Sequence, residues 1–430
     1  MPAPLRIAVA GLGTVGAGTL KLLAAQGKLL EARCGRPIQV VAVSARDKGR
    51  DRGLDLKAVQ WFDDPVAMAK APGIDVFVEV IGGSDGPAKQ ACEAAIASGK
   101  SVVTANKAML ALHGAALAEA AEAKGVTLAY EAAVAGGIPI IKALREGLAA
   151  NSVKRVYGIL NGTCNYILTT MRATGRDFAD VLSEAQKLGY AEADPSFDID
   201  GIDTAHKLAV LTAVAFGCRT NFAGVHVEGI RQVSALDIRF ADELGYRIKL
   251  LGLARRTSSG VEQRVHPCLV PVGTPIAHVE GVFNAVVAET DFAETNVFEG
   301  RGAGAGPTAS AIVADLVDIA RGAKVPTFAV PAAQLADLPA SPMASHVGAY
   351  YIRLTVVDKP GVIADVTAIL RDNEVSLESM LQRGRSPGET VPIVLVTHET
   401  REENMARALA KIAALDTVAE PPCMIRIEEP

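Results

Sequence analysis

The chain opens on the stretch Leu5-Arg6-Ile7-Ala8-Val9-Ala10-Gly11-Leu12-Gly13-Thr14-Val15-Gly16, an apolar run followed by glycines in the pattern G-x-G-x-x-G. The apolar run predicts a buried strand, and the residues that follow keep a helical pattern to Ala25. In that context the first glycine permits a tight turn, the second lets a pyrophosphate approach the backbone, and the third lets helix pack on strand. The stretch predicts a Rossmann-type α/β domain with a dinucleotide contacting Gly11, Gly13, Thr14, Val15 and Gly16. The alternative is a glycine-rich turn in an ordinary α/β domain.

The end of the next expected strand, residues 38–43, bears on which nicotinamide cofactor binds. A site for NAD usually carries Asp or Glu there to bind the ribose 2′-hydroxyl, but this strand ends in Ser-Ala-Arg46-Asp47-Lys. An arginine can pair with a 2′-phosphate, so Arg46 favours NADP. Asp47 leaves NAD possible, and a solvent-exposed basic loop is the interpretation without a ligand.

Two further segments of the first domain place polar groups beside predicted strands. The strand at 101–104 runs into Ala-Asn-Lys107, and ligands of such sheets bind at the carboxyl ends of strands, so Lys107 is a candidate contact for cofactor or substrate. A surface lysine at a helix start is the alternative. The strand at 127–130 runs into Glu131 and a glycine pair, where carbonyls can bind a hard cation. From the residues alone, an interdomain hinge is the simpler interpretation of that loop.

Residues 189–207 form the densest polar run of the chain, with five carboxylates and a lysine. Proline and aspartate make its first half a loop, and Asp200 is the expected N-cap of a following helix. Asp203 and Lys207 are four apart and share one face of that helix. Because the helix is apolar on nearly all sides it should be buried, and a lysine at its mouth would line a cleft as an acid or base. A solvated ion pair is the alternative.

The remaining segments complete a three-part organisation. We expect a dinucleotide-binding domain at 1–135, an α+β substrate and dimerisation domain at 136–306, a proline-rich linker at 323–346 and an independent unit at 347–430. A glycine-rich loop around Gly304 precedes a helix at 307–322 that is expected to return to the first domain. The last unit has the order βαββαβ, which is typical of a ferredoxin-like fold.

The composition excludes several classes of function. The 430 residues are 50% hydrophobic, carry a net charge of −5 and contain only 4% aromatic residues, which argues against a nucleic-acid binder. The six cysteines lack any C-x-x-C pair and are interpreted as reduced thiols, not as a zinc site or disulfides. The amino-terminal residues do not resemble a signal peptide, and apolar runs are too short for a bilayer. We therefore expect a cytoplasmic protein without membrane partners.

Taken together, five motifs carry a family resemblance over essentially the whole chain. They are Gly-Leu-Gly-Thr-Val-Gly at 11–16, Val-Val-Thr-Ala-Asn-Lys at 102–107, Leu-Asn-Gly-Thr-Cys-Asn-Tyr at 160–166, the polar run at 189–207 and Gly-Ala-Gly-Ala-Gly-Pro-Thr-Ala-Ser at 302–310. With them the chain resembles monofunctional bacterial homoserine dehydrogenases that end in an ACT domain. Asp-Lys-Pro-Gly-Val at 358–362 is similar to the first loop of ACT domains.

The resemblance implies a reaction and a set of residue roles. The reaction is L-aspartate 4-semialdehyde + NAD(P)H ⇌ L-homoserine + NAD(P)⁺, in threonine and methionine biosynthesis. Lys207 corresponds to the proton donor and a substrate contact, Lys107 to a second lysine near the same oxygen that also contacts the cofactor, and Asp203 to an orienting carboxylate. The other implied contacts are Glu192 and Asp198 for the substrate, Gly304 for the cofactor, Glu131 with the carbonyls of Val134, Gly136 and Ile138 for sodium, and Asp358 and Gly361 for an effector.

The resemblance also implies partners, whereas two other functions fit the motifs less well. An amino acid such as threonine is expected to inhibit through the ACT domain, and a homodimer or homotetramer is expected. Another NAD(P)-dependent reductase of a semialdehyde or imine would not need both the acidic run and the Thr-Ala-Asn-Lys strand end. A non-catalytic sensor of amino acids or nucleotides would not need the two lysines.

Overall fold

The first domain is built on a six-stranded parallel sheet in the order β3-β2-β1-β4-β5-β6. The structure is a computed structural model that describes residues 2–383 and 388–429. The strands are β1 (Leu5–Ala10), β2 (Ile38–Ser44), β3 (Gln60–Phe62), β4 (Val76–Glu79), β5 (Ser101–Thr104) and β6 (Leu128–Ala129). Helices α1 (Thr14–Cys34), α2 (Pro65–Lys70), α3 (Pro87–Ala97) and α4 (Lys107–Ala123) connect them. This is the strand order of a Rossmann fold, as predicted. The sequence did not predict the short elements β3 and α2.

The glycines of the first turn have the conformations that the motif requires. Gly11 has φ +100°, and a Cβ there would lie 2.4 Å from the carbonyl oxygen of Val80. A Cβ on Gly16 would lie 1.9 Å from the carbonyl oxygen of Gly11, so only glycine lets α1 approach β1 this closely. At Gly13 no described atom lies within 4 Å of the same position, which leaves the backbone accessible to a ligand.

A helix from the far end of the central domain packs against the first domain. Helix α11 (Ala305–Arg321) lies against α1, and the contact is close enough that a Cβ on Gly18 would come within 2.9 Å of the carbonyl oxygen of Ala305. Ile312 and Leu316 of α11 are fully buried in the same core as Leu20 and Leu23 of α1. The chain thus leaves the first domain and later returns to it.

The central domain is a mixed sheet with helices on one side. Its strands β7 (Val153–Ile159), β9 (Tyr246–Thr257), β10 (Gly260–Pro271), β11 (Phe283–Thr290) and β12 (Thr295–Arg301) are antiparallel in the order β12-β11-β7-β9-β10, and β8 (His226–Val227) pairs with β10. Its helices are α5 (Ile140–Lys142), α6 (Gly162–Thr174), α7 (Phe178–Lys187), α8 (Ser196–Ile199), α9 (Ile202–Phe216) and α10 (Ala235–Glu243). Helix α9 is buried along almost its whole length, as its all-round apolar sequence predicts.

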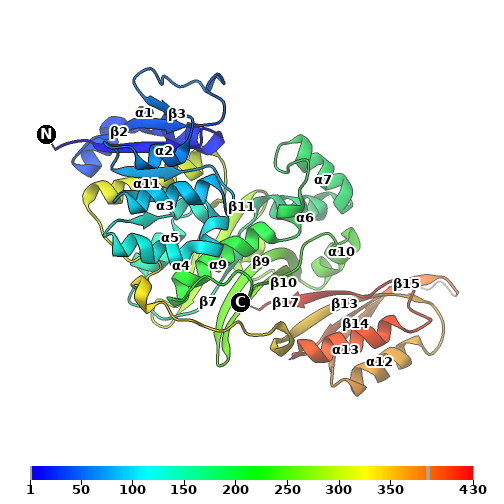
Figure 1. The fold of residues 1–430 in the computed structure, drawn as a ribbon. Coiled ribbons are helices and arrows are strands. Elements are labelled where there is room, and N and C mark those ends of the chain that lie inside the picture. Colours follow the sequence, from blue (N-terminus) through cyan, green and yellow to red (C-terminus); the bar gives the residue numbers. More distant parts are fainter. Residues whose placement is uncertain (1, 384–387, 430) are drawn as a thin grey trace.

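The C-terminal unit has the predicted βαββαβ order. It contains β13 (Val347–Val357), α12 (Val362–Asp372), β14 (Leu377–Gln382), β15 (Thr390–Thr397), α13 (Glu402–Ala413) and β17 (Cys423–Ile427), with a short β16 (Thr400–Arg401) beside β13. Its sheet order, β17-β13-β15-β14, is antiparallel throughout. Figure 1 shows this unit at the opposite end of the molecule from the first domain, with the central domain between them.

The expectation that this unit is independent is wrong. Strand β17 pairs in parallel with β10 of the central domain, with Cys268 opposite Arg426 and Leu269 opposite Ile427. The two sheets therefore form one eleven-stranded sheet. Asp237 of α10 adds a second connection, because it accepts hydrogen bonds from Tyr351 Oη at 3.0 Å and Arg353 Nε at 2.7 Å. We call the junction of β10 with β17 and β13 the seam.

The segment expected to be a linker, residues 323–346, is packed along the protein. Phe328 is buried beside Tyr130, whose hydroxyl donates to the carbonyl oxygen of Thr327 at 2.6 Å. Further along, Ala336 forms a bridge to Cys218, and Ala340 forms one to Val261. Its composition of proline and alanine resembles a flexible linker, but its few large side chains dock it on both domains.

Two further expectations concern the state of the cysteines and the presence of membrane-spanning helices. All six cysteines are buried and none is in a disulfide. Within the described ranges, no helix combines the length and hydrophobicity needed to cross a membrane.

Candidate active site

One buried carboxylate joins the two lysines that the sequence singles out. Oδ1 of Asp203 lies 2.9 Å from Nζ of Lys107, and Oδ2 accepts a hydrogen bond from Nζ of Lys207 at 2.7 Å. Lys107 begins α4 in the first domain, whereas Asp203 and Lys207 lie one turn apart on α9 in the central domain. This set of three residues, the ion cluster, therefore bridges the two domains.

The start of α9 differs from the prediction in one residue. The helix begins after Gly201, which has φ +84° and occupies the N-cap position. Asp200, the expected N-cap, instead accepts a hydrogen bond from Nη2 of Arg231 at 2.9 Å. Glycine tolerates the left-handed conformation that turns α8 into α9, which explains the choice of cap. Asp203 remains in the first turn, where the helix dipole favours a carboxylate.

The charges of the ion cluster stabilise one another. Burial would raise the pKa of Asp203, but the ammonium groups of Lys207 and Lys107 outweigh burial and hold that pKa well below its usual range. Burial would lower the pKa of Lys107, but attraction by Asp203 outweighs burial and, with weaker terms from Asp198 and Glu192, raises it. Asp203 and Lys107 are therefore ionised at neutral pH.

The two lysines differ in accessibility. The side chain of Lys107 is 33% exposed and that of Lys207 is 11% exposed. Besides Asp203, Nζ of Lys207 donates to the carbonyl oxygen of Leu160 at 2.7 Å. An ammonium has three donors, so within the described chain one N–H of Lys207 remains for a ligand.

Asn161 holds two of the acidic side chains in place, and sequence reasoning did not assign it a role. Its Nδ2 donates at 2.8 Å both to Oδ1 of Asp198 and to Oδ2 of Asp203. Its Oδ1 accepts from the backbone N–H of Cys164 at 2.8 Å and so caps α6. The sequence offered one signal for this role: Asn161 stands between a predicted strand and a predicted helix. A residue there can cap the helix and also reach a ligand at the edge of the sheet.

The two predicted substrate carboxylates lie beside this cluster at different depths. Asp198 on α8 is partly buried and accepts from Oγ1 of Thr163 at 3.2 Å. Burial, reinforced by repulsion from Asp203, raises the pKa of Asp198. Glu192 is exposed on the loop between α7 and α8, and its charge reaches Lys107. A cation placed between these carboxylates would be favoured by both.

An aromatic stack, which sequence reasoning also missed, lies against the ion cluster. The ring of Phe197 stacks on His206 at 5.5 Å between centroids, and His206 stacks on Phe222 at 4.2 Å. Nζ of Lys107 lies 5.7 Å from the centroid of Phe197. Phe197 is 44% exposed, which is unusual for a large apolar side chain beside a charged cleft. The Phe197 ring is close enough to Lys107 for a cation–π contact.

A cleft of about 890 Å³ lies at the carboxyl ends of β1, β2 and β4. Gly11 and Gly13 line one side, and Arg46, Arg50 and Arg52 lie around the other. The volume is in the range of cofactor sites, and the position is the topological switch point of the sheet. Asn106, the neighbour of Lys107, donates to the carbonyl oxygen of Gly83 in the cleft wall at 2.7 Å. The cleft and the ion cluster are thus adjacent along the same sheet edge.

The basic loop after β2 contains Arg46 and Asp47, the two residues that bear on the choice of cofactor. Oδ1 of Asp47 accepts from the backbone N–H groups of Gly49 and Arg50 at 2.9 and 3.2 Å, so its carboxylate stabilises its own turn. Arg52, not singled out from the sequence, donates through Nε to the carbonyl oxygen of Leu12 in the glycine loop at 3.0 Å. Arg46 is exposed at the rim of the cleft.

The loop proposed for a cation packs against the loop around Gly304. Glu131 is buried, and its two carboxylate oxygens accept from the N–H groups of Ile141 and Lys142, both at 2.9 Å. Burial, with repulsion from Asp315, raises the pKa of Glu131 to about 7. Gly136 has φ +45°, and a Cβ there would lie 2.4 Å from the carbonyl oxygen of Gly302.

The remaining residues predicted from the sequence belong to the cation loop, the cofactor site and the effector site. Val134 and Ile138 are buried on either side of Gly136. Gly304 has φ +115° and precedes α11, next to the first turns of α1. Asp358 and Gly361 lie far away, between β13 and α12, where the N–H of Asp358 donates to the carbonyl oxygen of Glu389 at 2.8 Å.

Comparisons with known proteins agree over the full length. Family models described as homoserine dehydrogenase NAD binding domain, homoserine dehydrogenase and ACT domain match residues 11–131, 139–317 and 350–416. Homoserine dehydrogenase of Neisseria gonorrhoeae is 46% identical, and the match covers 99% of each chain. The crystal structure of a homoserine dehydrogenase from Thiobacillus denitrificans is 49% identical with a TM-score of 0.94, covering 99% of this chain and 98% of that one.

A more distant structure lacks a counterpart for a quarter of the chain. A hyperthermophilic archaeal homoserine dehydrogenase in complex with NADPH is 26% identical with a TM-score of 0.65, and covers 75% of this chain and 99% of its own. The match to the two bacterial proteins extends over whole chains, and the family models cover both major domains. The chain therefore belongs to the homoserine dehydrogenase family of nicotinamide-dependent oxidoreductases.

Proposed function

We propose that this chain reduces L-aspartate 4-semialdehyde to L-homoserine with NADPH, and that Lys207 and Lys107 together bind the reacting carbonyl oxygen. The observation that carries the proposal is the pair of ammonium groups on opposite oxygens of one carboxylate, at 2.7 and 2.9 Å. Asp203 orients both lysines and compensates only one of their two positive charges. The other positive charge is available to an oxygen that becomes anionic during reduction.

Reduction of the aldehyde creates an alkoxide that must be stabilised and protonated. When bound, the nicotinamide cofactor supplies the hydride. Lys207 then gives the proton from Nζ, through the donor that Asp203 and Leu160 leave unused. Lys107, less buried, stabilises the same oxygen by its charge. A positioned general acid typically increases the rate 10²–10⁴-fold, and we assign a contribution of this size to Lys207.

The substrate ammonium fits the acidic groups beside the ion cluster. Asp198, whose pKa is raised by burial and by repulsion from Asp203, would be stabilised as a carboxylate by a cationic partner. Glu192 on the exposed loop supplies a second carboxylate. Phe197 beside Lys107 would exclude water from the aldehyde.

NADP is the favoured cofactor because positive charge surrounds the expected position of the ribose 2′-phosphate. Arg46 and Arg52 flank that end of the cleft, while the Asp47 carboxylate is engaged by its own turn. The archaeal relative bound NADPH. Gly11, Gly13, Thr14, Val15 and Gly16 would contact the pyrophosphate through the backbone and the start of α1, with Gly304 beside them.

A sodium ion fits the loop that follows Glu131. The buried carboxyl has a pKa of about 7, so it lacks full compensation for its charge, and the left-handed backbone at Ala135 and Gly136 reorients the adjacent carbonyls. Glu131 with the carbonyl oxygens of Val134, Gly136 and Ile138 would hold the ion and stiffen the interdomain loop. Sodium chloride should then raise the unfolding temperature more than choline chloride does, and Glu131→Gln should abolish the difference. Equal temperatures in the two salts would refute the sodium assignment.

An amino-acid effector, with threonine as the first candidate, is proposed to act through the C-terminal unit, and the chain is proposed to assemble as a homodimer or homotetramer. Light scattering at several concentrations tests the assembly, and a monomer throughout would refute it. The central experiment is NADPH oxidation with L-aspartate 4-semialdehyde, in the presence and absence of L-threonine. Turnover that falls with threonine is expected. Absence of turnover would refute the catalytic proposal, and turnover indifferent to amino acids would refute only the regulation.

A further inference from the structure

A second cavity, of about 330 Å³, lies at the seam and belongs to neither the ion cluster nor the cofactor cleft. It is bounded by β7, β9 and β10 of the central domain and by the start of β13, the start of β14 and the end of β17 in the C-terminal unit. We call it the seam pocket. Its walls carry charges of both signs: the residues used below are Arg155, Arg255, Arg264, His346, Glu378 and Glu399.

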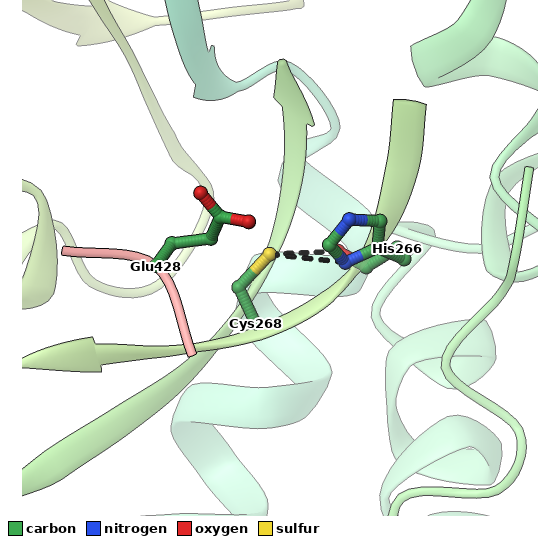
Figure 2. A group of neighbouring side chains, drawn as sticks. All are labelled: His266, Cys268 and Glu428. Carbon is green, nitrogen blue, oxygen red and sulfur yellow. Dashed lines mark hydrogen bonds between the residues drawn. The ribbon is translucent and has the colours of Figure 1, made fainter. Parts of the chain in front are cut away.

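A cluster of metal-type ligands borders the pocket, but an arginine already occupies its centre. His266, Cys268 and Glu428 present ligand atoms within 4.8 Å of one another, and Figure 2 shows the Cys268 thiol directed at the His266 ring. Nη1 of Arg264 lies 2.9 Å from Nε2 of His266 and also donates to Glu428. A metal ion would have to displace this buried guanidinium, so the cluster is a charge network and not a metal site.

This network, the seam network, joins both sides of the seam. Arg264 bonds Glu262 and Glu428, and Arg426 bonds Glu228 and Glu402 through several N–H groups. The guanidinium groups of Arg264 and Arg426 are therefore committed to carboxylates. The most exposed arginine of the pocket is Arg255, which is 43% exposed and donates to Glu262 at 3.0 Å.

The floor beside Arg255 contains a second polar group. The side chain of His346 is 3% exposed, and its Nε2 makes no hydrogen bond within the described chain. Its Nδ1 lies 3.2 Å from Oε1 of Glu262. A Cβ on Gly348 would come within 2.8 Å of Nε2, so the glycine makes room for the imidazole. A buried ring nitrogen without a hydrogen-bond partner is costly, so a donor or acceptor that reached it from the pocket would be favoured.

The pocket lining also contains carboxylates, and one of them stands at a strand irregularity. Leu377 pairs with Thr397 and Ser379 with Val396, so Glu378 is the extra residue of a bulge in β14. Bulges re-aim side chains, and here Glu378 lines the pocket together with Glu399. A pocket lined by both cations and carboxylates matches a molecule that carries both charges.

We propose that the seam pocket binds a small α-amino acid as a zwitterion, with its carboxylate on Arg255 and His346 and its ammonium on Glu378 and Glu399. The proposal rests on the effector regulation proposed above and gives that effector a location. The location differs from the loop of Asp358 and Gly361. The seam pocket is at the start of β13 and that loop is at its end, about 30 Å away at the usual rise per strand residue.

A short path connects the seam pocket to the ion cluster. Arg155 of the pocket lies on β7, and the same strand leads directly to Leu160 and Asn161, which bond Lys207 and Asp203. Occupation of the pocket that moves β7 or β10 would displace these contacts. Inhibition is then expected as a fall in kcat more than as a rise in KM for the semialdehyde.

Calorimetric titration of the full chain with L-threonine, L-isoleucine and L-methionine tests the assignment. The wild-type chain should bind at least one of them. Arg255→Gln and Glu378→Gln should each weaken that binding tenfold or more, while Arg371→Gln, at an exposed position of α12, should not change it. The N-acetyl derivative and the methyl ester of the same amino acid should fail to bind, because each lacks one of the two charges.

The outcomes separate this inference from the proposed function. Unchanged binding to Arg255→Gln and Glu378→Gln, with loss of binding to Asp358→Asn, would move the effector to the other end of β13 and overturn the seam pocket. Failure of all three amino acids to bind the active wild-type enzyme would overturn both the pocket and the proposed regulation, but not the catalytic proposal. Near-normal uninhibited turnover of the two seam variants shows that they are folded.

Discussion

The ion cluster and the seam network are both buried, and both join segments that are distant in sequence. They differ in the ratio of cations to carboxylates. In the ion cluster one carboxylate, Asp203, lies between two cations. In the seam network each of two arginines lies between two carboxylates. The three groups of the ion cluster therefore carry two positive charges and one negative charge, with the Lys107 side chain one-third exposed and the carboxylates of Asp198 and Glu192 nearby.

Under the proposed function, this difference distinguishes a reactive site from a structural joint. A cation whose donors are all used by carboxylates stabilises an interface but has nothing left for a substrate. Lys207 keeps one donor and Lys107 keeps solvent access, so the ion cluster can respond to a new anion. Variants of the ion cluster should therefore affect turnover, and variants of the seam network should affect stability.

The largest effect is expected for Lys207→Ala. Loss of the proton donor should lower kcat by about 10²–10⁴-fold, the range for a general acid, in steady-state NADPH oxidation. Lys249→Met is the matched control, because Lys249 is also a buried lysine of the central domain but, among the described residues, bonds Val279 and Asn165 and no carboxylate. Near-normal turnover of Lys207→Ala, or an equal loss in Lys249→Met, would remove the assigned role.

The complementary effect is expected for Arg426→Met in the seam network. The variant leaves Glu228 and Glu402 without their shared partner, which for buried pairs costs about 3–5 kcal/mol in the free energy of unfolding. Turnover per folded enzyme should change little. Arg371→Met, at an exposed arginine that pairs with the neighbouring Asp372, should change stability by less than about 0.5 kcal/mol. Denaturant titration checks both, and similar stabilities for the two variants would contradict the comparison.

A smaller effect is expected in cofactor choice. Arg46→Ala should reduce the ratio of kcat/KM for NADPH to that for NADH by about tenfold, since one charge-assisted contact to phosphate is worth about 1.5–3 kcal/mol. Lys28→Ala on the exposed side of α1 controls for the loss of a surface charge. An unchanged ratio would transfer 2′-phosphate recognition to Arg52 or remove the preference.

The smallest effect concerns acid stability. The pKa of Asp203 is depressed in the folded state, so its ionisation stabilises the fold above the usual pKa of aspartate, near 4, and that contribution is lost as pH falls below it. The wild-type free energy of unfolding should therefore fall more steeply between about pH 5 and pH 3 than that of Asp203→Asn. Parallel slopes would mean that Asp203 is not coupled to the lysines.

Local patterns in the sequence predicted much of this molecule. The glycine loop, the βαββαβ order and the buried helix α9 follow from periodicity and turn chemistry, and each is present. The spacing of Asp203 and Lys207 predicted their pairing, because helical neighbours four apart share a face. The edge strand β12 was missed because its residues are at most partly buried and lack a clear apolar alternation.

What the sequence did not predict depends on contacts between distant segments. The bond of Lys107 to Asp203 joins two domains, and the double role of Asn161 depends on where α8 and α9 meet. The pairing of β17 with β10 joins two units that each look complete, so the sequence alone suggested independence. The expected cap Asp200 was wrong because Arg231, far along the chain, binds its carboxylate.

The most direct test of the central claim is a double-mutant cycle on Lys107 and Lys207, measured as kcat for semialdehyde reduction. If both ammonium groups act on one oxygen, their contributions depend on each other, and the double alanine variant should be only slightly slower than the slower single variant. Rate losses that multiply independently, or a Lys107→Ala variant with wild-type turnover, would contradict the shared role of the two lysines.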